Sequence, residues 1–217
     1  VYRTDLSGRD KSFAFSPEDV LAGADIGLTD FDRVVLYRYD DTSADPDFDR
    51  FSNTLMLSGP VKYPGFYLYK TGMKLSEVLT KEQVLLDTNM NYGELTRLKG
   101  DGKNEYVTFR PGEVLGGSWD LTLGPRDVIK LVKVGYAPEE PDFDRYGDVV
   151  QVSGPVEFGG LYAWRGGMKL SGLLGLAKPK LDTNQVYAEV ARLGAGGVTQ
   201  TLTFALREVN AGTFDMD

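Results

Sequence analysis

The pattern of apolar and polar positions in the middle of the chain predicts short strands arranged around one helix. The run TLMLSGPV (54–61) stops at a Gly-Pro pair, and GFYLYK (65–70) begins at a Pro-Gly pair, so the two predict a β-hairpin. The segment MKLSEVLTKEQVLL (73–86) has apolar residues at helical spacing. It therefore predicts a helix of about two to three turns with its apolar side inward.

Further strands follow this helix. ELTRL (94–98) and EYVTF (105–109) are strand-like runs separated by an Asp-Gly turn signal. A last strand region is expected at WDLTL (119–123) and DVIKLVKV (127–134). The order β-β-α-β-β-β predicts an α+β fold in which one helix lies across a mostly antiparallel sheet, as in a β-grasp.

The chain repeats itself with a period of 95 residues. Residues 46–122 align with residues 141–217 without a gap, and 32 of the 77 pairs are identical. Such a repeat indicates one structural unit copied in tandem. We expect the back half of one unit plus a linker at 1–45 (the N-terminal segment), a complete unit at 46–140 (the middle repeat), and a further unit without its last strand at 141–217 (the C-terminal repeat).

Three expectations follow from the repeat. Tandem copies build extended or ring-like surfaces more often than active sites, so the repeat argues against catalysis. The missing ends of the outer units indicate a piece of a longer protein. An open sheet edge invites strand pairing, so the strand expected at 26–37 would complete the C-terminal repeat of a neighbouring molecule.

Composition removes several classes of function. The chain has no cysteine and no histidine, which excludes thiolate metal sites and Ser-His-Asp or Cys-His catalysis within it. The net charge is −8, and no cluster of Lys and Arg stands out, so nucleic acid is not an expected partner. No apolar run approaches the length of about 18 residues that a membrane span needs. We expect neither a cofactor nor enzymatic activity.

The ordered motifs resemble a known family. SGPV followed by YPGFYLYKTGMKLSEVL, with LGPRDVIKLV closing the unit, is similar to the SLBB domain, a soluble-ligand-binding β-grasp, and the C-terminal repeat keeps SGPV, GGLYAW and GGMKLSGLL. Tandem SLBB domains are typical of bacterial outer-membrane polysaccharide export proteins. The resemblance therefore implies a periplasmic location at the outer membrane of a Gram-negative-type bacterium. It also implies homo-oligomerisation in the full-length protein, other channel subunits as partners, and weak or transient contact with polysaccharide.

Aromatic residues on the second strand are the candidate ligand-binding residues. They occupy matching positions in the two repeats: Tyr67 with Tyr162 and Tyr69 with Trp164, while Tyr63 precedes the turn in the middle repeat. Aromatic side chains beside polar groups can stack on the C–H face of a sugar ring. The alternative is that they pack under the helix or stabilise the sheet.

Other recurring residues have a structural and a functional interpretation. The acidic linkers at 40–50 and 139–145 could hold Ca²⁺, although their spacing is not that of an EF-hand and a solvated linker is favoured. Their repeated Phe and Arg (Phe48, Phe143, Arg50 and Arg145) predict a fixed joint between units. LDTN at 86–89 and 181–184 predicts a turn or cap, with a sugar-hydroxyl contact as the alternative.

Three functional hypotheses remain from the sequence. The first is a non-enzymatic scaffold module of a polysaccharide exporter, and the second is a dedicated module for a soluble small molecule or glycan. A glycan-processing enzyme is the third, and it would need paired carboxylates across a cleft. Glu94 and Arg97, three residues apart on a strand, face opposite sides and form no catalytic pair. The exposure of Tyr69 and Trp164 separates the first two hypotheses, because a binding module needs a concave aromatic pocket.

Overall fold

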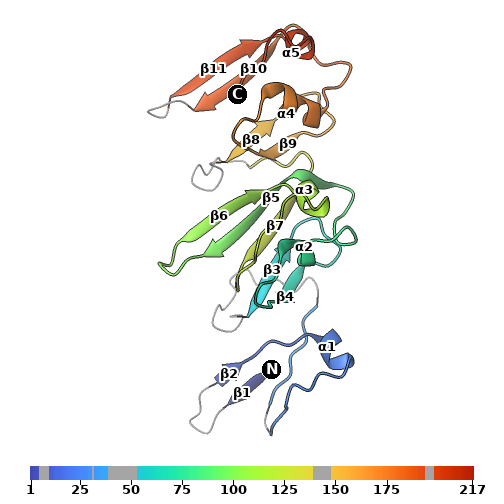
Figure 1. Cartoon of the computed structure of the whole chain (residues 1–217), viewed down its shortest axis with the longest axis vertical. Coiled ribbons are helices and arrows are strands. Elements are labelled where there is room, and N and C mark those ends of the chain that lie inside the picture. Colours follow the sequence, from blue (N-terminus) through green and yellow to red (C-terminus); the bar gives the residue numbers. More distant parts are fainter. Residues whose placement is uncertain (5–9, 31, 39–52, 139–147, 194–197) are drawn as a thin grey trace. The chain divides into compact units, whose positions relative to one another are not determined.

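The computed structural model describes residues 1–4, 10–30, 32–38, 53–138, 148–193 and 198–217 (Figure 1). The chain divides into two compact units, Val1–Lys133 and Val134–Asp217, called unit 1 and unit 2 below. Unit 1 holds the N-terminal segment and most of the middle repeat, and unit 2 holds the C-terminal repeat. The fold combines a mixed sheet with a few short helices, which is an α+β architecture.

The middle repeat builds one five-stranded sheet with the order β4-β3-β7-β5-β6. The central strand β7 runs parallel to β3, and the other neighbours are antiparallel. The β3–β4 and β5–β6 hairpins confirm the strand pairs predicted from the sequence. The strands are β3 (Thr54–Ser58), β4 (Gly65–Leu68), β5 (Thr88–Leu98), β6 (Asn104–Phe109) and β7 (Val128–Lys133).

One hydrophobic cluster holds this sheet and its two short helices together. Alternate residues of the central strands point to the same face, as the period of two requires. They meet apolar residues of α2 (Leu75–Val78) and α3 (Pro111–Leu115). The buried members of the cluster are Leu55, Leu57, Val61, Leu75, Val78, Leu79, Leu95, Phe109, Val114, Leu123, Ile129 and Leu131.

The predicted helix over 73–86 is wrong in length, because α2 ends at Val78. Leu79 leaves the helical conformation, and Val84 then forms a bridge with Val61 beside the β3–β4 connection. One helical turn is enough to bury Leu75 and Val78, so the following residues pair with the sheet rim instead. The helix α3 was not predicted, and 119–123 forms only a bridge between Thr122 and Lys74 rather than a strand.

Unit 2 repeats the element order of the middle repeat up to the second short helix. Its described strands form two separate two-stranded sheets, β8–β9 and β10–β11, and its described buried residues include one cluster around Tyr162 and another around Phe204. The elements are β8 (Val149–Val152), β9 (Gly160–Ala163), α4 (Leu170–Ala177), β10 (Ala188–Leu193), β11 (Thr199–Phe204) and α5 (Leu206–Asn210).

The N-terminal segment contains a short antiparallel pair, β1 (Tyr2–Thr4) and β2 (Asp10–Ser12), followed by α1 (Pro17–Leu21). The Ser16 hydroxyl caps α1 by accepting a hydrogen bond from the Asp19 backbone N–H. The strand expected at 26–37 is reduced, among its described residues, to a single bridge between Tyr2 and Arg33. Of the helices that the structure describes, none is long and apolar enough to cross a membrane.

Candidate functional site

Tyr67 and Tyr162 have the same role in the two repeats. The Tyr67 hydroxyl donates to the backbone carbonyl of Tyr63 at 2.6 Å and accepts from the Gln83 amide at 2.8 Å. The Tyr162 hydroxyl donates to the carbonyl of Phe158 in the same way, and the Tyr162 side chain is fully buried. Burial raises the pKa of Tyr162. Both hydroxyls therefore fasten the turn that precedes the second strand.

Tyr69 and Trp164 follow the last residues of β4 and β9, and their environments differ. Tyr69 packs against the hydrophobic cluster of the middle repeat. Trp164 keeps 43% of its surface exposed, and its backbone N–H donates to Asp148 at 2.9 Å. Tyr63 is half-buried beneath the Lys62 ammonium, 4.8 Å from the ring centre. Of the five candidate aromatics, Trp164 presents the largest accessible ring.

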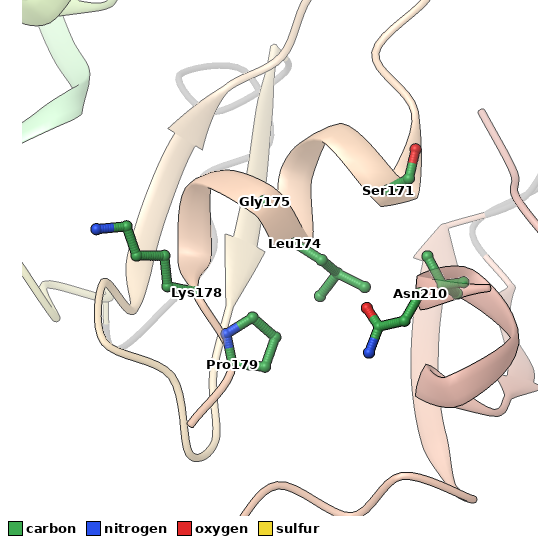
Figure 2. Close-up of a pocket in the computed structure, with 7 residues that line it drawn as sticks. Ser171, Leu174, Gly175, Lys178, Pro179 and Asn210 are labelled. Carbon is green, nitrogen blue, oxygen red and sulfur yellow. The ribbon is translucent and has the colours of Figure 1, made fainter. Parts of the chain in front are cut away.

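Unit 2 has a hollow of about 420 Å³ between α4 and α5 (Figure 2). Leu174 and Asn210 approach it from the two helices, and Pro179 and Val209 add apolar surface. In Figure 2 the Lys178 side chain extends away from Asn210, and its ammonium lies 3.7 Å from the Glu157 carboxylate. None of the candidate aromatics is among the described residues that line this hollow, so the structure does not combine the two features into one aromatic pocket.

The LDTN loops are tied to the sheet by matching hydrogen bonds. Thr88 donates its hydroxyl to the Pro60 carbonyl at 2.7 Å, and Thr183 does the same to Pro155. The Asn89 side chain accepts from the backbone two residues on, as an Asx turn does. The Thr hydroxyls and the Asn side chain are therefore hydrogen-bonded within the protein, as the turn or cap interpretation of the motif predicts.

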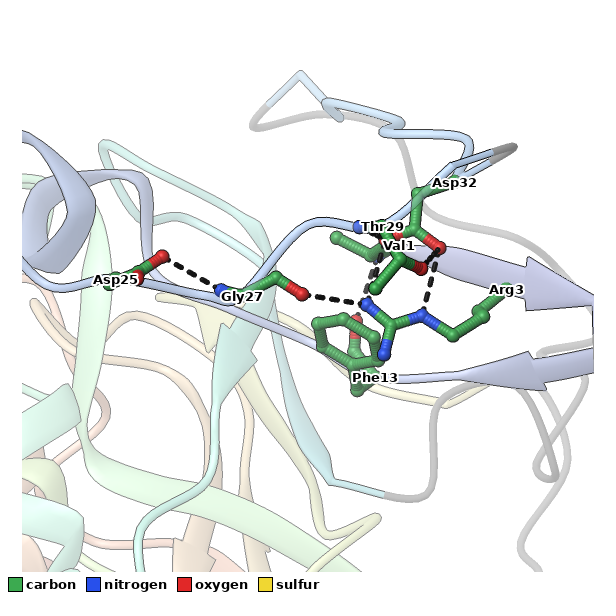
Figure 3. A network of polar contacts seen from close by, with 7 residues as sticks. All are labelled: Val1, Arg3, Phe13, Asp25, Gly27, Thr29 and Asp32. Atoms are coloured by element: carbon green, nitrogen blue, oxygen red, sulfur yellow. Dashed lines mark hydrogen bonds and ion pairs between the residues drawn. The ribbon is translucent and has the colours of Figure 1, made fainter.

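A bidentate ion pair recurs where the closing strand begins. In the middle repeat Arg97 donates to both carboxylate oxygens of the fully buried Asp127, at 2.9 and 2.6 Å. In the N-terminal segment Arg3 binds Asp32 with the same geometry, at 2.9 and 2.8 Å (Figure 3). This pairing was not predicted from the sequence.

Glu94 and Arg97 do not meet, as their spacing on one strand predicted. Glu94 is buried and accepts a hydrogen bond from the Tyr92 hydroxyl at 3.1 Å, whereas Arg97 reaches Asp127. The equivalent pair in the C-terminal repeat, Tyr187 and Glu189, is exposed. The Tyr–Glu contact is therefore a recurring structural pair rather than part of a cleft.

A second recurring contact fastens the first helix of each repeat. The Ser76 hydroxyl donates to Asp120 at 2.7 Å, and the Ser171 hydroxyl donates to Asp215 at 2.6 Å. Burial alone would raise the pKa of Asp120, but hydrogen bonds from Ser76 and from the Leu121 backbone outweigh it and lower the pKa. The hydrogen bonds from Ser171 lower the pKa of Asp215.

The arrangement offers little reactive chemistry in the part of the chain that the structure describes. No group of three or more Asp or Glu side chains there could hold a metal ion. The acidic linkers, with Phe48, Phe143, Arg50 and Arg145, lie outside the described residues. What the described residues do provide is a set of recurring contacts that fix the turns, helices and strands of each repeat.

Comparison with known proteins finds a family match over a short segment of the chain. The model of the SLBB domain matches residues 54–81, which run from the start of β3 to just beyond α2. No curated protein matches the chain. The matched segment contains Tyr63, Tyr67 and Tyr69, so three of the candidate aromatics lie within the SLBB match.

Proposed function

We propose that the chain is a non-enzymatic scaffold module of a bacterial polysaccharide export channel, for a capsule or an exopolysaccharide. The observation that carries the proposal is the SLBB match at residues 54–81. SLBB domains form a binding and scaffold family rather than a catalytic one, and they occur in polysaccharide export proteins. In this proposal the module faces the periplasm at the outer membrane and contacts other subunits of the channel, with homo-oligomerisation of the full-length protein.

The recurrence of elements extends the proposal beyond the matched segment. The C-terminal repeat carries the β8–β9 hairpin and α4 in the order of β3, β4 and α2, and its hairpin has the matching register. This supports tandem β-grasp domains of the SLBB type. Fold alone does not fix function, so the export role needs its own test.

The site geometry favours a scaffold over a receptor. The tyrosine hydroxyls of Tyr67 and Tyr162 are committed to backbone carbonyls, and Tyr69 packs on the core. The net charge of −8 also suits the wall of an export channel, because a negatively charged surface does not retain an acidic polymer that passes it. Contact with polysaccharide is then weak or transient.

An in-frame deletion of the middle repeat in the source bacterium tests the export role. The proposal predicts that surface polysaccharide falls strongly while polymer synthesis continues, so that polymer accumulates inside the cell envelope. The matched control is the substitution Leu86→Ala, which alters a fully exposed side chain and should leave export unchanged. Normal surface polysaccharide in the deletion strain would contradict the proposal.

A dedicated ligand-binding module is the second candidate, and the exposure of Trp164 favours it. An exposed indole on a strand end is a surface on which a sugar ring can stack. The two candidates differ in affinity: a receptor binds a defined oligosaccharide saturably through Trp164, whereas a scaffold does not.

A further inference from the structure

Two residues other than glycine have a left-handed backbone conformation among the described residues, and both are basic. They are Arg126, with a φ of +68°, and Lys178, with a φ of +52°. Glycines occupy the other positive-φ positions of the described chain, twelve in all. A side chain in this region costs conformational energy that glycine avoids, so each of the two exceptions needs a reason of its own.

A helix end explains Lys178. It is the C-cap residue of α4, and its ammonium lies 3.7 Å from the Glu157 carboxylate. A cation is favoured at the C-terminus of a helix, where it faces the negative end of the helix dipole. Lys178 therefore has a structural reason for its position, which makes it a matched control for Arg126.

Arg126 occupies a tight turn that backbone bonds hold together. The Asp127 N–H donates to the Gly124 carbonyl at 3.3 Å, and the Gly124 N–H donates to the Asp127 carboxylate at 2.7 Å. Pro125 and Arg126 are the central residues, and the positive φ of the second is the arrangement of a type II turn, which favours glycine there. The Arg126 N–H donates to the Thr54 carbonyl at 2.7 Å, a bond that a glycine would also supply.

The N-terminal segment has the same backbone bonds with a different residue at this position. The Asp32 N–H donates to the Thr29 carbonyl at 3.2 Å, and the Thr29 N–H donates to the Asp32 carboxylate at 2.9 Å (Figure 3). The residue before Asp32 in the sequence is Phe31, whereas the residue before Asp127 is Arg126. The bonds that close the turn therefore recur without an arginine, so the reason for Arg126 lies in its guanidinium.

The surroundings of Arg126 suit an anionic sugar. Arg126 is half-exposed and Pro125 is exposed, so a guanidinium and an apolar ring occupy consecutive accessible positions. Residues 53–133, which hold the five-stranded sheet, contain eleven Lys and Arg against nine Asp and Glu, whereas the whole chain has a net charge of −8. The turn therefore belongs to the positive part of an acidic chain. A guanidinium has five N–H donors in a fork that matches a carboxylate, so a contact within the chain leaves donors for a ligand.

We propose that Arg126 binds the carboxylate of an acidic sugar residue, such as a uronate, in the polymer that passes the module. The guanidinium pairs with the carboxylate, and the Pro125 ring lies against the C–H groups of the sugar. The strained backbone at Arg126 is the cost of placing a cation on the turn. This inference rests on the proposed contact with polysaccharide and names the class of polymer. A single exposed ion pair is weak, which agrees with a transient contact.

Frontal affinity chromatography on immobilised oligogalacturonate at low ionic strength tests the site. The wild-type chain should be retained, and Arg126→Gly should bind at least about threefold more weakly. Lys178→Gly removes the same charge from the other positive-φ position, and its affinity should stay close to that of the wild-type chain. Neutral dextran oligomers should not retain the chain. An unretained wild-type chain, equal retention by dextran, or equal losses for the two variants would overturn the proposal.

Urea denaturation separates a binding role of Arg126 from a structural one. Arg126→Gly relieves the strain at a φ of +68°, so the urea midpoint of unfolding should rise by about 0.2–0.5 M. An arginine that held the fold together would lower the midpoint when removed, and a lower midpoint would overturn the proposal even if retention weakened. The export role has its own test in the deletion of the middle repeat. It stands if that deletion reduces surface polysaccharide while Arg126→Gly leaves oligogalacturonate binding unchanged.

Discussion

Arg97, through its ion pair with Asp127, should contribute more to the stability of the folded chain than Arg192, its counterpart in the C-terminal repeat. Arg97→Ala leaves the carboxylate of Asp127, which is fully buried, without its bidentate partner. Removing one member of a buried ion pair costs about 3–5 kcal/mol. Because the Arg97 side chain retains 29% exposure, water screens part of this interaction. The expected loss in the free energy of unfolding is therefore about 2–3 kcal/mol.

Urea denaturation followed by Trp119 fluorescence measures this loss. Trp119 stacks on Phe109 at 6.3 Å between ring centres, inside unit 1, so Trp164→Phe makes it the sole tryptophan reporter. With a urea dependence of about 2 kcal/mol per M, the Arg97→Ala midpoint should fall by about 1 M or slightly more.

Arg192→Ala is the matched control for Arg97→Ala, read out through Trp164 in a Trp119→Phe chain. Its side chain is exposed and lacks a buried carboxylate partner among the described residues, so the loss should stay below about 0.5 kcal/mol. Equal losses for the two arginines, or a loss below about 0.5 kcal/mol for Arg97→Ala, would refute the reasoning.

Two further predictions concern a matched pair of glycines and the pH dependence of stability. Gly59→Ala combines backbone strain with a clash against β7, because a Cβ there would lie 2.0 Å from the Leu131 carbonyl oxygen, whereas a Cβ on Gly154 would meet nothing within 4 Å. Gly59→Ala should therefore cost about 1–3 kcal/mol more than Gly154→Ala, and equal costs from urea denaturation would contradict this. The pKa of Asp120 is lower in the folded chain, so its contribution to stability is present above the unfolded pKa and is lost as the pH falls through the folded one. Ser76→Ala should therefore reduce the acid-dependent loss of unfolding free energy between about pH 5 and pH 2, and an unchanged pH profile would count against the contact.

Local signals in the sequence predicted the strands but not the end of the helix. The Gly-Pro and Pro-Gly pairs mark the ends of β3 and the start of β4, because turn residues act within a few positions. The apolar spacing at 73–86 continues past Val78, but Lys62 and Val61 pair with the backbone of Gln83 and Val84. That competition is tertiary, so helical periodicity alone could not reveal it.

The candidate site, too, was predicted only in part, because its hydrogen bonds depend on the folded structure. The repeat identified Tyr67 and Tyr162 as equivalent, but their hydroxyl bonds to backbone carbonyls depend on the folded turn. The partner of Arg97 lies 30 residues away on another strand, beyond any local pattern. A weak signal did exist, since an Arg precedes an Asp by 29 residues in the N-terminal segment and by 30 residues in the middle repeat. Two recurrences of one pair indicate spatial contact.

The measurement that most directly tests the scaffold account is a fluorescence titration of the Trp119→Phe chain with capsule or exopolysaccharide oligosaccharides. Trp164, which is 43% exposed, is then the sole tryptophan and reports directly on a sugar stacked against it. Trp119→Phe is a mild change, because Phe214 stacks on Phe204 at the matching position. The account predicts no saturable change up to millimolar oligosaccharide. A saturable change at micromolar concentration, absent from the Trp164→Phe chain, would contradict it and make this a dedicated glycan-binding module.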